Sequence, residues 1–187
     1  MSELFSIQLQ NRQQQGRDGV WLDLPTTTEQ VQAALRQIGI SSDNPQGLFI
    51  SGYFAEEGKR FAIPYNMVLA SNVDELNFLA ARLETLSAGG RAELNAALQA
   101  PQSELFSIGR ITDFPENVDY YVHLPEVHGH AQLGDYYLNR SGMVDMPEEW
   151  KGGIDTAQFG RYVAQQEQGA FTQYGYLVKI GRASCRE

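Results

Sequence analysis

The stretch that decides the fold of the N-terminal part is GVWLDLPTTTEQVQAALRQIG, residues 19–39. The run VWLDL at 20–24 is rich in β-branched and aromatic residues, which predicts a strand that the following proline ends. A helix is predicted from Thr28 to Ile38, because Thr27 and Gln30 stand in capping-box positions and the apolar residues after them keep helical spacing. The stretch therefore predicts a strand followed by an amphipathic helix.

The flanking sequence adds two strands to this unit. Residues 3–9 alternate between two faces, which is the period of a strand with one buried side. Residues 48–54 (LFISGYF) are apolar and aromatic, which is typical of a strand. We therefore expect residues 1–63 to form a three-stranded sheet packed on one helix.

The middle of the chain, residues 64–102, is predicted to be a helical module. Asn72 caps a helix whose leucines keep helical spacing to about Ser87. A second helix is predicted from Arg91 to Ala100, where Pro101 ends it. Together these helices form a helical hairpin.

Residues 103–179 are predicted to form a third, α+β module. Helices are expected at 132–139 and 156–167, and the aromatic run at 171–178 is expected to be one strand. The segment 105–108 is either a short strand or the start of a short helix. The fold class is thus α+β, as three small modules in series: sheet plus helix, helical hairpin, and sheet plus helices.

One hexapeptide, Ser-Glu-Leu-Phe-Ser-Ile, occurs twice, at 2–7 and at 103–108. The repetition marks either a duplicated module or a coincidence. It does not recur at a fixed period, so the chain is not predicted to be a solenoid.

The overall composition is that of a folded acidic protein. The chain has 187 residues, 42% of them hydrophobic, and a net charge of -9. No apolar stretch is long enough to span a membrane, and the N-terminus lacks the pattern of a secretory signal, so we expect a cytoplasmic location. The negative charge disfavours binding to nucleic acid. It indicates either attraction to basic protein surfaces or acidity that serves solubility.

The last eight residues, 180–187, look like the translation of a common sequencing-adapter oligonucleotide. We expect this tail to be an artefact that plays no part in the fold. It contains Cys185, the single cysteine of the chain, so neither an internal disulfide nor a cysteine-based zinc site is expected.

Residues that could carry catalysis do not form a recognisable pattern. His123, His128 and His130 lie close together around Glu126, which would allow zinc binding, but the spacing matches no zinc motif and surface or capping histidines are the favoured interpretation. Phosphate-binding loops and nucleophile elbows are absent from the sequence. We therefore expect no catalytic residue, no metal and no cofactor. The scattered basic residues also disfavour direct nucleic-acid binding.

Acidic residues outnumber basic ones in the third module. They are either a solvated surface with helix caps, or together an imitation of a phosphate track. Asp155 stands in a capping position, and Glu148 and Glu149 in a first turn, where the helix dipole favours them. The candidate mimic carboxylates are Asp113, Glu116, Asp119, Glu126, Asp135, Asp145, Glu148, Glu149, Asp155 and Glu167.

Five segments, in order along residues 1–179, together resemble the ArdA antirestriction family. They are 19–25 (GVWLDLP), 48–53 (LFISGY), 72–86 (NVDELNFLAARLETL), 133–137 (LGDYY), and a motif region. The last is similar to the antirestriction motif of that family and consists of Val144, Asp145, Met146, Pro147, Glu148, Ile154, Asp155, Phe159, Gly160 and Arg161. Within it, two acids and one aromatic residue of the usual pattern are absent from 155–162.

The resemblance implies a fold and a function. ArdA proteins are expected to be curved, elongated chains of three modules that form a homodimer through the motif region. Their carboxylates would imitate DNA phosphates and occupy the DNA-binding groove of type I restriction–modification enzymes. We therefore predict a non-enzymatic antirestriction protein of a mobile element such as a plasmid or conjugative transposon. The alternative is an acidic protein–protein interaction module without DNA mimicry. A histidine-based enzyme ranks third.

Overall fold

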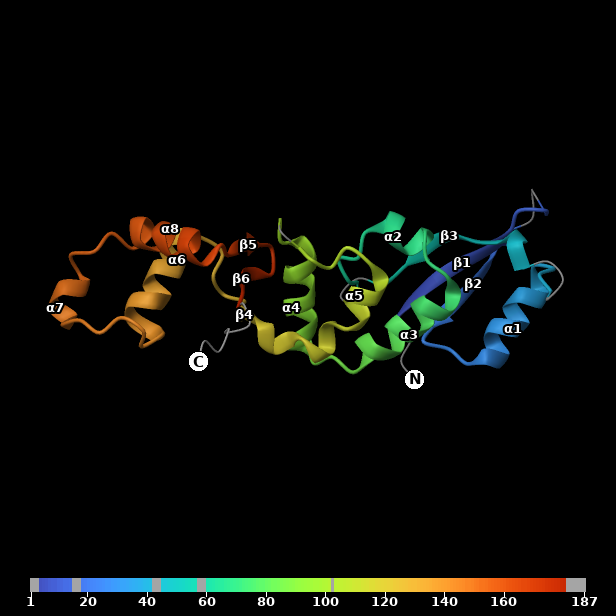
Figure 1. Ribbon diagram of the computed structural model, residues 1–187, viewed down its shortest axis with the longest axis horizontal. Helices are drawn as coiled ribbons and strands as arrows, with labels where there is room; N and C mark the ends of the chain where they lie inside the picture. Colours follow the sequence, from blue (N-terminus) through green and yellow to red (C-terminus); the bar gives the residue numbers. More distant parts are fainter. Residues whose placement is uncertain (1–3, 15–17, 42–44, 57–59, 102, 181–187) are drawn as a thin grey trace, which may run out of the picture. The chain divides into compact units, whose positions relative to one another are not determined.

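The computed structural model describes residues 4–14, 18–41, 45–56, 60–101 and 103–180 (Figure 1). It combines helices with two small antiparallel sheets, which confirms the α+β class. The chain divides into two compact units. Unit 1 comprises Met1–Ser87 and Glu104–Pro115, and unit 2 comprises Ala88–Ser103 and Glu116–Glu187. The three-module division stays a prediction, and most of the adapter-like tail, residues 181–187, lies outside the described residues.

Unit 1 contains the three-stranded sheet that the sequence predicts. Its strands are β1 (Phe5–Asn11), β2 (Val20–Leu24) and β3 (Leu48–Phe54), in the antiparallel order β2-β1-β3. Alternation along β1 buries Phe5, Ile7 and Leu9 almost completely. A bulge between Gln8 and Leu9 shifts the register against β3.

Two helices of unit 1 are attached to this sheet through asparagine side chains. Helix α1 (Thr28–Gln37) has the predicted capping box, and Asn11 Nδ2 donates to the carbonyl of Ile38 at 3.0 Å where the helix ends. Helix α3 (Val73–Glu84) begins at the predicted cap, Asn72. Its Asn77 side chain accepts from Thr26 N at 2.7 Å and donates to Thr26 O at 3.0 Å. All three hydrogen bonds join a side chain to backbone near the end of an element, so they fix where α1 and α3 attach.

Two short helices complete unit 1. Helix α2 (Tyr65–Leu69) contacts β3, and α5 (Ile108–Thr112) contacts α3. Ser107 caps α5 by accepting from Arg110 N, so the segment 105–108 leads into a helix, which decides between the two predicted alternatives. No helix within the described ranges is long and apolar enough to cross a membrane.

The aromatic run at 171–178 is a hairpin, so the prediction of one strand was wrong. It forms β5 (Ala170–Thr172) and β6 (Gly175–Lys179), and β4 (Tyr121–Leu124) pairs with β6 in the order β4-β6-β5. Thr172 Oγ1 accepts from Tyr174 N at 3.1 Å and closes the turn. Gly175 follows with φ +111°, a conformation that side chains rarely adopt, and a Cβ there would collide with the Leu124 carbonyl.

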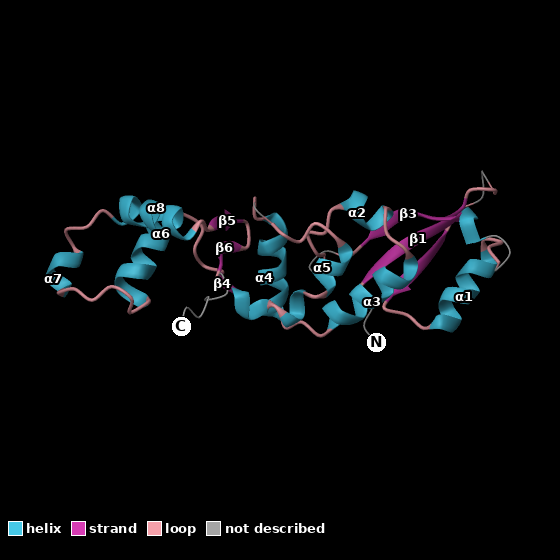
Figure 2. Cartoon of the chain, in the orientation of Figure 1, coloured by secondary structure: helices cyan, strands magenta, loops and turns pink. Residues whose placement is uncertain are grey.

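Helices cover the second sheet in unit 2 (Figure 2). Helix α4 (Ala88–Gln99) contacts β6. Helix α6 (His130–Asp135), its continuation as a π-helical turn (Tyr136–Arg140) and α8 (Thr156–Glu167) surround a core that includes Leu133, Tyr137 and Tyr176. This confirms the predicted helices near 132–139 and 156–167. The short α7 (Glu148–Lys151) has Glu148 and Glu149 in its first turn, as the sequence predicts.

Helices α6 and α8 approach each other through two glycines. A Cβ on Gly134 would collide with the Thr156 carbonyl, and a Cβ on Gly160 would collide with the His130 carbonyl. Both carbonyls belong to the backbone of a helix, so they cannot move aside as a flexible side chain could. The crossing is therefore closer than any residue other than glycine allows.

We expect Gly160→Ala to lower the free energy of unfolding by about 1–3 kcal/mol or more, because the added methyl forces the two helices apart. Urea unfolding followed by circular dichroism measures the change. Gly152→Ala is the matched control: a Cβ at Gly152 has nothing within 4 Å, and its φ of -65° suits alanine. Equal stability of the two variants would contradict the close crossing.

Candidate functional site

The motif region divides structurally into an exposed segment and a packed segment. Residues 144–148 run along the surface from the end of the π-helical turn to α7, and Asp145, Pro147 and Glu148 are exposed. Val144 and Met146 are partly buried. This first half of the motif is therefore available to a partner.

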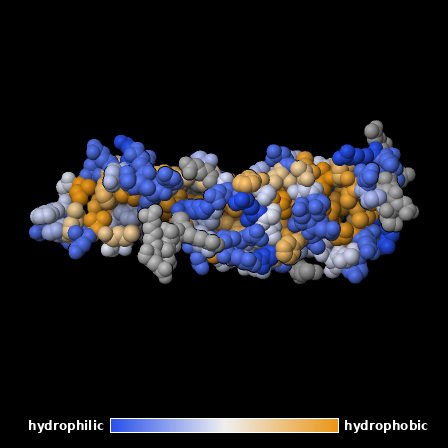
Figure 3. Space-filling view, viewed as in Figure 1, coloured by the Kyte–Doolittle hydropathy of each residue, from blue (hydrophilic) through white to orange (hydrophobic). Residues whose placement is uncertain are grey.

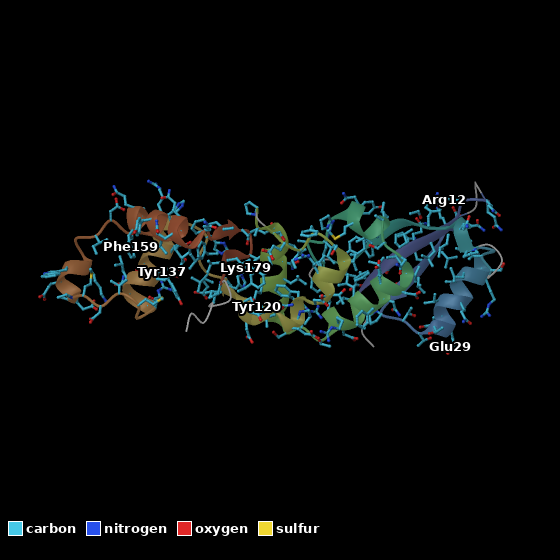
Figure 4. The ribbon with its side chains drawn as sticks, viewed as in Figure 1. Arg12, Glu29, Tyr120, Tyr137, Phe159 and Lys179 are labelled. Carbon is cyan, nitrogen blue, oxygen red and sulfur yellow. The ribbon has the colours of Figure 1, made fainter. Side chains whose placement is uncertain are left out.

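The second half of the motif builds the start of α8. Asp155 caps the helix, its Oδ1 accepting from Ala157 N at 2.9 Å and Gln158 N at 3.1 Å. Phe159 packs on the core of unit 2, as Tyr137 does (Figure 4), and Gly160 makes the crossing with α6. Arg161 is exposed and Ile154 is partly buried. The packing of Phe159 and Gly160 is thus explained within one chain.

At least six of the ten candidate carboxylates interact within the described chain, and for four of them the partners are clear. Asp135 accepts from Asn139 at 2.8 Å and from Arg140 at 2.9 Å, and these hydrogen bonds lower the pKa of its carboxyl. Glu148 pairs with Lys151 at 2.6 Å. Asp155 is the cap described above. Glu167 accepts from the hydroxyls of both Tyr137 and Tyr176, so its role is to fasten α8 to the core.

The other candidates are exposed. Asp119, Glu126, Asp145 and Glu149 are exposed, and no basic side chain in the described part of the chain pairs with them. Glu116 is exposed as well and takes part in a further interaction. Asp113 follows α5 and belongs to unit 1, whereas the remaining candidates belong to unit 2. The exposed carboxylates of unit 2 are therefore the strongest candidates for contact with a basic partner.

Two of the three histidine side chains take part in local structure, and the third, His128, is exposed. His123 Nε2 lies 2.7 Å from the Tyr174 carbonyl, across the sheet of unit 2. His130 packs its ring edge-on against Phe171, with centroids 4.9 Å apart. Among the described residues no group of three or more His, Cys, Asp or Glu side chains could hold a metal ion.

Sequence reasoning missed Glu93, which lies on α4. Its Oε1 is buried with no hydrogen-bond partner among the described residues. Burial raises the pKa of the Glu93 carboxyl to about 7, and the nearby charge of Asp119 adds to the rise. In the sequence Glu93 is one more acid on an amphipathic helix, so only the fold reveals it.

We expect Glu93→Gln to stabilise the protein at pH 8 and to change it little at pH 5. A raised carboxyl pKa means that the folded state holds the proton more tightly than the unfolded state does. The contribution of Glu93 to the free energy of unfolding is therefore full at low pH and is lost as the pH rises from about 4.5 through about 7. Thermal unfolding at both pH values measures the difference. Glu149→Gln, which neutralises an exposed carboxylate, should show no such pH-dependent gain.

The second feature that sequence reasoning missed is the apolar surface beside the motif. Met143 is 74% exposed and Trp150 is 66% exposed. In the space-filling view, hydrophobic residues reach the surface near α7 (Figure 3). The run from 143 to 150 (MVDMPEEW) has neither helical nor strand periodicity, so its pattern could not tell buried from exposed positions.

The model of one protein family, described as antirestriction protein (ArdA), matches residues 15–178. The chain belongs to the ArdA antirestriction family. The match spans strands β2 and β3 of unit 1, the capped helix α3 and the motif region, and it confirms the resemblance found in the sequence. An ArdA protein has an antirestriction function: it inhibits restriction enzymes and is not itself an enzyme. A search of curated proteins found no match.

Proposed function

We propose that this ArdA protein inhibits type I restriction–modification enzymes by imitating DNA and occupying their DNA-binding groove. The observation that carries the proposal is the set of exposed carboxylates that have no basic partner among the described residues, namely Asp119, Glu126, Asp145 and Glu149. In both units, described acidic side chains outnumber basic ones. A groove that binds the phosphates of DNA through lysine and arginine would attract such a surface.

The family membership supplies the setting for this proposal. Restriction enzymes act on DNA that has entered a cell, so we propose that the inhibitor acts in the cytoplasm and that its gene lies on a mobile element such as a plasmid or conjugative transposon. The competing proposal is an interaction module that binds through apolar contacts without mimicry. The exposed Trp150 and Met143 favour it. The two proposals differ in their salt dependence, because apolar contacts are not screened by ions.

We expect the protein to inhibit a purified type I enzyme in competition with DNA, and less strongly at higher salt. A variant with Asp119→Asn, Glu126→Gln, Asp145→Asn and Glu149→Gln should inhibit at least tenfold more weakly at low salt, because it lacks the exposed charges. DNA cleavage and methylation assays at two salt concentrations measure both effects.

The matched control is Glu104→Gln combined with Arg110→Gln. It removes an ion pair outside the candidate carboxylates and leaves the net charge unchanged, so inhibition should persist. If the variant with four substitutions inhibits as strongly as the natural sequence, the mimicry proposal is overturned and the interaction module is favoured.

We also propose that the protein is a homodimer that associates through the exposed half of the motif region. Trp150 and Met143 supply the apolar surface that such a contact needs. Trp150→Glu should convert dimer to monomer, because it would bury a charge in the contact. Sedimentation equilibrium measures the mass, and Phe78→Glu on α3, which is also an exposed aromatic position, should leave it unchanged. Dimers in both variants would refute this contact.

A further inference from the structure

The sheet of unit 1 has an open face that the mimicry proposal does not use. Phe5, Ile7, Leu9, Leu22 and Leu24 point into the core. The alternate positions point the other way and carry Ser6, Gln8, Gln10, Trp21, Asp23, Phe49 and Phe54. On this open face Trp21 is 49% exposed and Phe54 57% exposed. An indole in such a position is a surface feature that core packing does not explain.

The indole of Trp21 reaches across the open face of the sheet. Trp21 pairs with Gln8, and Gln8 pairs in turn with Gly52 on the other side. The Cη2 atom of Trp21 reaches 3.0 Å from the place that a Cβ on Gly52 would occupy. The ring therefore extends over the middle strand toward the far one, and about half of the residue stays exposed to solvent.

A carboxylate stands beside this ring. Asp23 lies two residues after Trp21 on β2, so both side chains project from the same face about 7 Å apart. Its Oδ1 accepts from Ser6 Oγ at 2.5 Å, which fixes the carboxylate on the exposed surface. In the described part of the chain no cationic side chain pairs with Asp23 or stacks on Trp21.

Unit 1 contains two cation–π pairs, and one of them includes a carboxylate as well. The Arg110 guanidinium lies 4.5 Å from the centre of the Phe106 ring, and its Nη1 is 3.9 Å from Glu104 Oε2. On the open face itself, the Arg12 guanidinium lies 5.4 Å from the centre of the Phe49 ring. Trp21 and Asp23 repeat the ring and carboxylate of the first site, but no guanidinium among the described residues joins them.

We propose that Trp21 and Asp23 form a receptor for an arginine side chain on a protein partner. Tryptophan presents the strongest π-face for a cation, and the carboxylate would pair with the edge of the same guanidinium. Arginine fits better than lysine because its planar group can stack and pair at once. The net charge of -9 draws a basic partner to the surface. The receptor stands independently of DNA mimicry and is tested without any restriction enzyme.

The test uses the indole N–H signals of the full-length protein in ¹⁵N NMR spectra. The chain has two tryptophans, so the Trp150 signal is an internal control for Trp21. The probe is the blocked peptide acetyl-Gly-Arg-Gly-Arg-Gly-amide, compared with peptides that carry lysine or the neutral citrulline in place of arginine. We expect the arginine peptide to shift the Trp21 signal in a saturable way and leave Trp150 in place, with weaker binding of lysine and none of citrulline.

Three variants complete the test. Trp21→Leu, followed by backbone amide signals of β2, and Asp23→Asn should each weaken binding of the arginine peptide about two- to fivefold. Glu29→Gln removes one charge from α1, on the other side of the sheet, and should leave binding unchanged. Equal binding of arginine and lysine peptides, equal shifts of both tryptophans, or no effect of Trp21→Leu and Asp23→Asn would overturn the receptor. Preserved β2 amide signals in the free variants confirm that the sheet is folded.

Discussion

The contact between the backbones of α6 and α8 is the constraint on which unit 2 depends. Gly134 and Gly160 let the two helices approach until only hydrogen atoms separate their chains. Once α8 is held there, Phe159 and Val163 reach the core. At the far end of the same helix, Glu167 meets the hydroxyls of Tyr137 and Tyr176. The exposed half of the motif region bridges the two helices, so its position also depends on this contact.

Local sequence predicted the elements whose ends are marked by side chains. Strand β2 and helix α1 were found with nearly their observed limits, because the capping box of Thr27 and Gln30 is a local interaction. The hexapeptide shared by 2–7 and 103–108 shows where this fails. Its first copy enters β1, whereas in the second copy Ser107 caps α5. The same residues take different structures because β2 and β3 flank only the first copy.

The turn at 173–174 was missed for a related reason. Gln173 and Tyr174 are not typical turn residues, and the aromatic residues around them favour a strand. What makes the turn is the Thr172 hydroxyl and the one glycine that can adopt a positive φ next to the Leu124 carbonyl. That carbonyl is about 50 residues away in the chain, so no local pattern contains the information.

The candidate site shows the same limit for charges. The sequence identified the acidic residues but not their partners, and so it grouped Glu167, which is held by two tyrosines, with Asp145, which faces solvent. It identified the motif but not its division into an exposed and a packed half. Burial and pairing are properties of the folded chain, and they separate carboxylates that a partner can reach from carboxylates that hold the fold.

The amide of Asn77 sets a limit on how acidic this protein can become. Like a peptide group, its side chain both accepts from the Thr26 amide and donates to the Thr26 carbonyl. Aspartate has the same shape, and a single nucleotide change separates the two codons. An aspartate at this position, however, would place a carboxylate oxygen opposite the Thr26 carbonyl. That carbonyl would then lose the N–H donor that Asn77 supplies. Evolution toward greater negative charge is thus open to most of the surface and closed at this residue, which keeps a neutral amide at the junction of β2, α1 and α3.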